Sequence, residues 1–146
     1  MSQTSQSYDD SNIFAKIIQG DIPCHKVYED DMTVAFMDIM PQAKGHVLIV
    51  PKQQAVDLSQ LEPEYASAVL MTAQKVMQAQ RQVLSREGIV QMQLNGSEAG
   101  QTVFHYHVHL IPSSIHELGR HGSSQADQEE LATLAAQFKE AIDTAR

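Results

Sequence analysis

The spacing of apolar residues in the first third of the chain predicts one short helix followed by three strands. In segment 12–19 (NIFAKIIQ) the apolar residues recur at helical spacing, and Gly20 and Pro23 behind it terminate a helix. The next three segments are short, contain β-branched or aromatic residues and are bounded by Asp, Pro or Gly: HKVYEDD (25–31), TVAFMDIM (33–40) and GHVLIVPK (45–52). Because Asp30 and Asp31 suit a tight turn, we expect an antiparallel meander.

A long helix is predicted over residues 62–86, because its apolar residues lie three, four or seven positions apart. Two starts are compatible with the sequence: a capping box formed by Ser59 and Glu62, or a first turn at Pro63 directly after Glu62. Gly88 is expected to end the helix. The residues expected on its apolar stripe are Ala66, Val69, Leu70, Ala73, Val76, Met77, Val83 and Leu84.

The pattern in the last part of the chain predicts two strands and a helix. The strands are IVQMQLN (89–95) and FHYHVHLIP (104–112), and the small, polar segment GSEAGQTV (96–103) joins them. A loop is expected over 113–124, followed by a C-terminal helix over about 125–145. The apolar stripe of this helix consists of Leu131, Leu134, Ala135, Phe138 and Ile142.

This order of elements predicts an α+β fold: a five-stranded antiparallel sheet with a short N-terminal helix, a long central helix and a C-terminal helix. Consecutive strands can pair antiparallel, and we expect the helices to cover one face of the sheet. Residues 1–11 are rich in Ser, Gln and Asp and are expected to be disordered. The remainder, 12–146, has the length of a single domain and contains no linker that would divide it.

Composition and charge narrow the classes of partner. The net charge is −8, the chain has no cluster of Lys or Arg, and it has no Trp, so we expect no nucleic-acid polymer to bind. A small anionic ligand is compatible with this charge, because a pocket can be locally positive. No run of 18 apolar residues is present, so we expect no membrane span, and the polar start of the chain does not resemble a secretory signal.

The chain contains a single cysteine, Cys24, which cannot form an internal disulfide or a cysteine-based zinc cluster. We expect Cys24 to be a buried or half-buried thiol near a turn rather than a nucleophile. Together with the missing secretory signal, this composition predicts a cytoplasmic protein.

Three histidines of the strand predicted over 104–112 occur at every second position: His105, His107 and His109. Since alternate residues of a strand share a face, the three imidazoles are expected on one face of the sheet. The residues between and before them are expected on the opposite face, against the core: Phe104, Tyr106, Val108 and Leu110.

Three interpretations of these histidines remain open: exposed surface residues, ligands of a metal ion, or groups in nucleophilic catalysis. A metal site would need carboxylates from elsewhere in the fold, because no Asp or Glu lies between Glu98 and Glu117. In the third interpretation, one neutral imidazole attacks phosphorus while its neighbours orient it and stabilise the developing charge. The preceding loop favours this chemistry, since its backbone N–H groups, Gln101 and Thr102 can surround a phosphate.

Three segments, in this order along the chain, resemble the histidine triad (HIT) family: FMDIMPQAKGHVLIVPK, NGSEAGQTVFH and HYHVHLI. The resemblance covers roughly residues 12–112 and points to the Hint-like branch. It implies a HIT-like fold and a homodimer whose two sheets join, with the long helix and the strand at 89–95 near the interface. It also implies a nucleotide hydrolase or nucleotidyl transferase that requires no metal.

The resemblance also implies a role for each matching residue. His107 would attack the α-phosphate and form a nucleotidyl-histidine, which water then resolves. The groups that orient it and stabilise charge would be His46, His105 and His109. The residues implied in nucleotide binding are Asp38 at the ribose; Ile39, with Phe14 and Ile18, at the base; Gln101 and Thr102 at the phosphate or leaving group; and Asn95 and Gly100 at the phosphate and its loop.

Purely structural roles stay open for some of these residues. Asp38 could cap a turn at a strand end, His46 could be a core or surface histidine, and Asn95 with the following glycine forms an ordinary turn dipeptide. The histidines that match no part of the family motif are expected in loops: His25, His116 and His121.

Many bacterial members that resemble this chain carry two cysteines in the first helix and a histidine after Pro-Lys, which help to form a structural zinc site. This chain has Asn12, Ala15 and Gln54 at those positions. We therefore expect no structural zinc and no other cofactor. The absence of these zinc ligands also weakens the metal interpretation of His105, His107 and His109, which are called the triad below.

Within the family, Asp38 and Asn95 favour a Hint-like activity: hydrolysis of a purine nucleoside phosphoramidate or a related adenylated compound. One alternative is hydrolysis of dinucleoside polyphosphates (Ap3A/Ap4A), and another is a nucleotide-binding scaffold whose hydrolysis is incidental. A metalloenzyme is a third, and it would contain stoichiometric zinc or iron. A neutral imidazole nucleophile predicts that the rate falls as the pH drops below the imidazole pKa.

Overall fold

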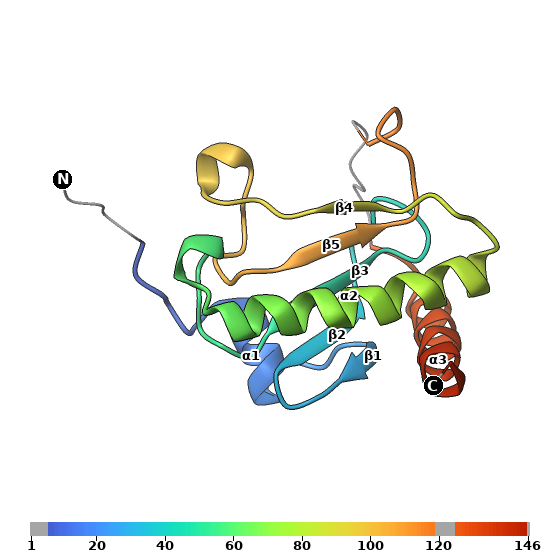
Figure 1. The fold of residues 1–146 in the computed structure, drawn as a ribbon, viewed down its shortest axis with the longest axis horizontal. Helices are drawn as coiled ribbons and strands as arrows, with labels where there is room; N and C mark the ends of the chain where they lie inside the picture. Colours follow the sequence, from blue (N-terminus) through green and yellow to red (C-terminus); the bar gives the residue numbers. More distant parts are fainter. Residues whose placement is uncertain (1–5, 119–124, 146) are drawn as a thin grey trace.

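Five short strands form one antiparallel sheet in the computed structural model of the protein, which describes residues 6–118 and 125–145 (Figure 1). The strands are β1 (Lys26–Glu29), β2 (Thr33–Met37), β3 (Val47–Pro51), β4 (Val90–Met92) and β5 (Val108–Ile111). Their order across the sheet is β1-β2-β3-β5-β4, and every neighbouring pair is antiparallel. The α+β class and the five-stranded antiparallel sheet expected from the sequence are confirmed.

Three α-helices accompany the sheet in the described part of the chain: α1 (Ile13–Gln19), α2 (Pro63–Leu84) and α3 (Gln128–Thr144). Two short 3-10 helices lie in loops, η1 (Leu58–Gln60) and η2 (Ser97–Ala99). Figure 1 shows α2 running along the sheet, with α3 beside its C-terminal end. α1 begins at Asn12, whose side chain accepts the Ala15 N–H, and it ends at Gly20 in the left-handed conformation.

The two faces of the sheet carry separate apolar clusters, because β2 and β3 are buried at every position and both of their faces must be covered. On one face, alternate strand residues such as Ala35, Met37 and Ile49 pack with α2 and α3. The cluster on the other face consists of Phe14, Ile17, Val34, Phe36, Leu48 and Val50. The expectation that all helices cover one face is therefore wrong for α1, which packs on the opposite side.

The first residue of α2 decides between the two helix starts that were compatible with the sequence. The helix begins at Pro63, and Glu62 in the N-cap position makes no side-chain capping hydrogen bond. Ser59 instead donates to Asp57, so the capping box does not form. The helix ends before Gly88, because Ser85 already adopts the left-handed conformation at φ 54°. Leu70 is 53% exposed and lies outside the buried stripe, contrary to expectation.

The last two strands are shorter than predicted. β4 pairs with β5 only over Val90–Met92, and β5 begins at Val108 rather than at Phe104. The backbone before β5 leaves the ladder because the Tyr106 N–H donates to the Ala55 carbonyl at 2.8 Å. As a result, His105 and His107 precede the strand, and Phe104 is only half-buried.

The ends of the chain depart in part from the expected tail and loop. Of the segment expected to be disordered, residues 1–5 lie outside the described residues, but 6–11 are placed against the molecule. The Gln6 carbonyl accepts a hydrogen bond from Gln60, and Tyr8 contacts His105. α3 begins after Asp127, whose side chain accepts the Glu130 N–H, and its predicted apolar stripe is buried. Of the predicted loop 113–124, positions 119–124, including His121, lie outside the described residues.

None of the described helices is both long and apolar enough to cross a bilayer. Cys24 is a free, half-buried thiol, and burial raises its pKa above the ordinary value. A raised pKa disfavours the thiolate, in keeping with the structural role expected for this residue.

The loop 41–46 approaches the helices closely at Gly45. Gly45 has φ +87°, and a Cβ atom there would lie 2.7 Å from Leu84 Cδ1 and 3.3 Å from Phe138 Cζ. The buried Gln80 side chain of α2 donates to the Gly45 carbonyl at 2.9 Å and to the Leu110 carbonyl of β5 at 3.0 Å. Gly45 and Gln80 together therefore fix the loop that precedes β3.

Replacing Gly45 with alanine is expected to destabilise the protein more than replacing Gly20. Gly20 has almost the same φ, +88°, but a Cβ there would meet nothing within 4 Å. Both changes place an L-residue in the left-handed region, at about 1–2 kcal/mol. Gly45→Ala should lose a further 1–3 kcal/mol, roughly, through overpacking. Urea unfolding of the two variants measures the difference, and equal losses would contradict the close approach at Gly45.

Candidate active site

Pairing of β3 with β5 brings together histidines that are far apart in the sequence. His46 directly precedes β3, and His109 lies within β5, where it pairs with Leu48. Nε2 of His46 and Nδ1 of His109 are 3.0 Å apart. The rings of His107 and His109 meet edge to face, with centroids 5.0 Å apart. The alternation in the sequence therefore places His107 and His109 together, and the fold adds His46.

His105 is fully buried, and both of its ring nitrogens have partners. Nε2 lies 2.8 Å from the Pro51 carbonyl oxygen, and Nδ1 lies 2.6 Å from the Tyr8 hydroxyl. Because a carbonyl can only accept, Nε2 carries the proton and Nδ1 accepts from Tyr8. Burial lowers the pKa of His105 to about 4, although its hydrogen bond to Pro51 opposes that shift. The ring is therefore neutral at pH 7.

The tautomer of His107 is set by a backbone group. Its Nδ1 lies 2.7 Å from the carbonyl oxygen of His105, so Nδ1 carries the proton and Nε2 keeps its lone pair. Burial lowers the pKa of His107 below the ordinary value, while the hydrogen bond to His105 and the charge of Asp38 act in the opposite direction. At neutral pH His107 therefore presents an unprotonated Nε2, which is the form a nucleophile requires.

A hydrogen-bonded chain links Gln42, His46 and His109. The Gln42 N–H donates to Nδ1 of His46 at 3.1 Å, so His46 carries its proton on Nε2 and donates it to Nδ1 of His109. His109 consequently keeps its own proton on Nε2. Burial, followed by the charge of His107, lowers the pKa of His46 to about 4. Burial and then the neighbouring His107 and His46 lower the pKa of His109 to about 3.

Asp38 is the carboxylate of this cluster. Its Oδ1 accepts the Met40 N–H at 2.8 Å, and its Oδ2 lies 3.5 Å from Nε2 of His46. The turn-capping role and the site role that the sequence left open are thus both compatible with its position. Asp38 contributes a negative charge that favours protonation of His107 and His109.

Part of this cluster has the composition of a metal site. Asp38, His46 and His109 offer three ligand atoms that lie within 4.8 Å of one another. A metal ion at Nε2 of His46 would displace the proton to Nδ1. That atom accepts the Gln42 N–H, so two N–H groups would face each other. The geometry favours a hydrogen-bonded chain over a metal centre.

An apolar pocket of ≈ 360 Å³ opens beside His107 and His109. Its polar lining residues are Asp38, Thr102 and these two histidines. Phe14 of α1 forms one wall, and its ring meets the His107 ring edge to face at 4.8 Å. The remaining lining residues are Ile13, Ile17, Ile22, Pro23, Cys24, Phe36, Met37, Ile39, Met40, Leu48 and Val103. A flat, largely apolar group would fit next to the His107 side chain.

Three residues expected at a nucleotide do not line this pocket. Gln101 is buried and donates to the Val56 and Val103 carbonyls, while its oxygen accepts the Gly96 N–H, so its side chain holds the loop 96–103 together. Gly100 caps η2 in the left-handed conformation. Asn95 is exposed, and its oxygen accepts hydrogen bonds from Leu58 N–H and Gln93. In this conformation their contacts organise the loop.

Other expected residues are placed as follows. Ile39 and Phe14 line the pocket, whereas Ile18 does not, and Ile13 and Ile17 of the same helix take its place. Tyr8 contacts the triad although nothing in the apolar pattern of residues 1–11 marked it. A tyrosine alone in a polar stretch was the one available signal. Among the remaining histidines, His25 pairs with Gln128 at the surface and His116 is exposed.

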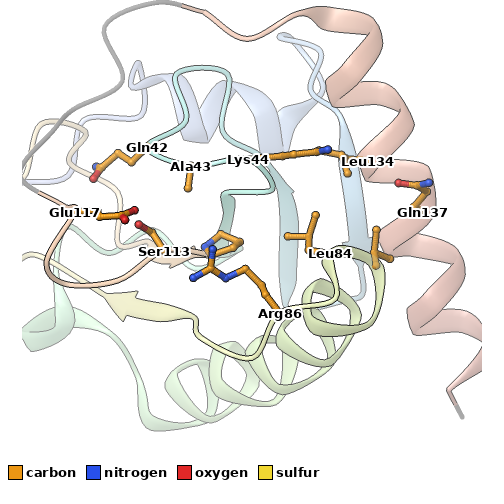
Figure 2. Close-up of a pocket in the computed structure, with 11 residues that line it drawn as sticks. Gln42, Ala43, Lys44, Leu84, Arg86, Ser113, Glu117, Leu134 and Gln137 are labelled. Carbon is orange, nitrogen blue, oxygen red and sulfur yellow. The ribbon is translucent and has the colours of Figure 1, made fainter.

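A larger cavity of ≈ 700 Å³ is lined by the loop 41–46, the end of α2, the residues that follow β5, and α3. The two cationic side chains that line it, Lys44 and Arg86, do not point toward a common position. Figure 2 shows Lys44 extended toward Leu134 and the Arg86 guanidinium turned toward Ser113. Among the described residues, no imidazole lines this cavity, whereas His107 and His109 line the apolar pocket.

Comparison with known proteins shows which family the chain resembles. Residues 19–116 match the HIT domain model. Adenosine 5'-monophosphoramidase hnt1 of Schizosaccharomyces pombe is 40% identical over 109 residues, which cover 75% of this chain and 79% of that protein. Adenylylsulfatase HINT3 of Arabidopsis thaliana is 34% identical over 108 residues, covering 74% and 55%.

A solved structure extends the likeness to the fold. The crystal structure of a Hit-like protein involved in cell-cycle regulation from Bartonella henselae is 40% identical, with a TM-score of 0.85, and the match covers 93% of this chain and 99% of that one. With a family model matched over most of its length, this fold and these clustered histidines, the chain belongs to the histidine triad (HIT) family.

Proposed function

We propose that the protein is a nucleotide hydrolase that cleaves a purine nucleoside phosphoramidate, or a related adenylated compound, through a nucleotidyl-histidine at His107. The observation that carries this proposal is the 2.7 Å hydrogen bond from Nδ1 of His107 to the His105 carbonyl. It leaves the Nε2 lone pair free on a residue that lines the apolar pocket. Relatives named as a monophosphoramidase and an adenylylsulfatase support a hydrolase as the general kind of protein.

In the proposed first step, Nε2 of His107 forms a bond to the α-phosphorus, and the bond from phosphorus to the leaving nitrogen breaks. The departing amine takes a proton from a water molecule, which the Nε2–H of His109 can hold beside the leaving nitrogen by a hydrogen bond, because the chain leaves this donor available. Water then attacks phosphorus, the bond to His107 breaks, and the nucleoside monophosphate leaves. The proton that the attacking water loses neutralises the hydroxide left by the first step.

The proposed nucleotide position follows from the character of the pocket walls. The apolar side chains of Phe14, Ile17 and Ile39 would enclose the base, and Asp38 would hold the ribose hydroxyls. Thr102, at the pocket edge, would contact the phosphate. Gln101, Gly100 and Asn95 would act by shaping the loop that carries Thr102, consistent with their contacts.

The alternatives differ in measurable ways. Dinucleoside polyphosphates (Ap3A/Ap4A) share the α-phosphate but present a larger leaving group. A nucleotide-binding scaffold would bind AMP and turn over no substrate. The four ordered imidazoles and their defined tautomers favour an enzyme over a scaffold, since a binding surface has no need of an unprotonated nucleophile. A metalloenzyme would lose activity with a chelator.

We also propose that the protein is a cytoplasmic homodimer. Two features support a second copy as partner. β4 forms an edge of the sheet. The outer surface of α2 exposes the apolar side chains of Leu70 and Met71, at 53% and 59%. An edge strand and exposed apolar side chains both favour association.

Replacing His107 with alanine is expected to reduce turnover of an AMP–amine phosphoramidate by about 10³-fold or more, because the nucleophile is lost. His25→Ala is the matched control, since His25 is a surface residue outside the pocket. The measurement is product release from a panel of the phosphoramidate, adenosine phosphosulfate, Ap3A and Ap4A. Equal rates for the wild type and His107→Ala would reject the mechanism, and AMP binding without any turnover would favour the scaffold.

The pH dependence is expected to place the acid limb below the ordinary imidazole value of 6.5, because burial lowers the pKa of His107. The neutral form reacts, so kcat/KM should decline in acid with a midpoint below pH 6.5. A midpoint at or above 6.5 would contradict the buried nucleophile. Circular dichroism at each pH is the control, since histidines that are neutral in the fold accept protons on unfolding, and stability falls in acid.

Sedimentation equilibrium is expected to give a mass of about twice 16.2 kDa. Met71→Glu should shift the protein toward the monomer, because a buried charge at an interface is costly. Lys44→Gln, on the loop 41–46 away from β4 and the outer surface of α2, serves as a control that should leave the mass unchanged. A wild-type protein that sediments at the monomer mass would rule out the dimer.

A further inference from the structure

The N-terminal segment 6–11 reaches the triad through Tyr8. The Tyr8 hydroxyl lies 2.6 Å from Nδ1 of His105, and the two rings meet edge to face with centroids 5.6 Å apart. Tyr8 precedes residues 19–116, which match the HIT domain, and belongs to none of the motifs that mark the family. The triad is therefore contacted by a segment that lies outside the matched region.

The direction of this hydrogen bond follows from the other side of the ring. Nε2 of His105 must donate to the Pro51 carbonyl, so Nδ1 of the neutral ring can only accept. Burial raises the pKa of the Tyr8 hydroxyl, which keeps its proton available for donation. Tyr8 thus supplies the partner that the second nitrogen of a fully buried imidazole requires.

The backbone of His105 connects this contact to His107. The carbonyl of His105 accepts the Nδ1–H of His107 at 2.7 Å. The His105 ring is held at one nitrogen by Pro51 and at the other by Tyr8, so the peptide that bears this carbonyl is held as well. Loss of the Tyr8 hydroxyl would leave Nδ1 buried without a partner and would loosen the group that orients His107.

The segment itself is anchored on both sides of Tyr8. Gln60 donates to the Gln6 carbonyl at 2.8 Å, and the Asn12 side-chain amide donates to the Asp9 carbonyl at 2.8 Å. Asn12 also caps α1. Since Phe14 of α1 contacts the His107 ring, the segment and α1 together contact two neighbouring histidines.

We propose that Tyr8 is a positioning residue for His107: its hydroxyl, delivered by the segment 6–11, holds His105 and thereby the carbonyl that selects the His107 tautomer. Its effect on rate rests on the proposed function of His107. Its effect on the rings of His105 and His107 is independent of that proposed function.

The test compares Tyr8→Phe, which removes only the hydroxyl, with Tyr28→Phe. Tyr28 donates to Asp30 at the surface and serves as the matched loss of one hydroxyl. Two kinds of measurement are made on the full chain. One gives the ¹⁵N chemical shifts of the His105 and His107 ring nitrogens, and the other gives kcat and KM for the AMP–amine phosphoramidate. Tyr8→Phe should shift the nitrogen signals of both rings. It should lower kcat about five- to tenfold with KM within about twofold, as expected for one buried hydrogen bond.

Tyr28→Phe should change neither quantity. A Tyr8→Phe variant with unchanged His107 nitrogen signals and unchanged kcat overturns the proposal, even if its melting temperature falls. A shift confined to His105 with wild-type kcat also overturns it, because the contact would then be structural only. If the wild type hydrolyses none of the substrates, the proposed function fails, and the His107 nitrogen signal alone decides the role of Tyr8.

Discussion

Each ring nitrogen of a buried imidazole needs a hydrogen-bond partner, and the site of this protein is organised around that requirement. Pro51, His105 and Gln42 satisfy one nitrogen each of His105, His107 and His46, and all three do so with backbone groups. Backbone positions are set by the sheet and its loops. The fold therefore determines which nitrogen of each ring carries the proton, and one lone pair is left on His107.

The histidines around His107 have low pKa values, so they keep these hydrogen bonds in their neutral form. Burial is the largest cause of lowering for His46, His105 and His109, with nearby imidazoles adding to it. Protonating any one ring would place a charge in a poorly solvated cluster whose counter-charge is Asp38. The four imidazoles consequently stay neutral at pH 7.

The two faces of the sheet have different roles: one carries most of the apolar core, and the other carries the candidate site. One face is covered by α2 and α3 and forms the larger apolar cluster, while the other carries the short helix α1 and leaves the apolar pocket open beside His107. Gly45 and Gln80 connect the two sides, because they fix the loop that leads into His46 against the helices. Packing on one face thus controls the position of an imidazole on the other.

Patterns in the sequence were enough to predict the order and type of the elements, the antiparallel sheet and the common face of His107 and His109, because helical and alternating periodicities are local properties. The motif segments were also sufficient to indicate the HIT family. Long-range contacts, in contrast, place α1 on the opposite face, start β5 at Val108 and make Gln101 hold its loop. The fold also brings Tyr8 to His105, a contact between distant segments that no local pattern encodes, and it shapes the loop in which the Gln42 N–H meets His46.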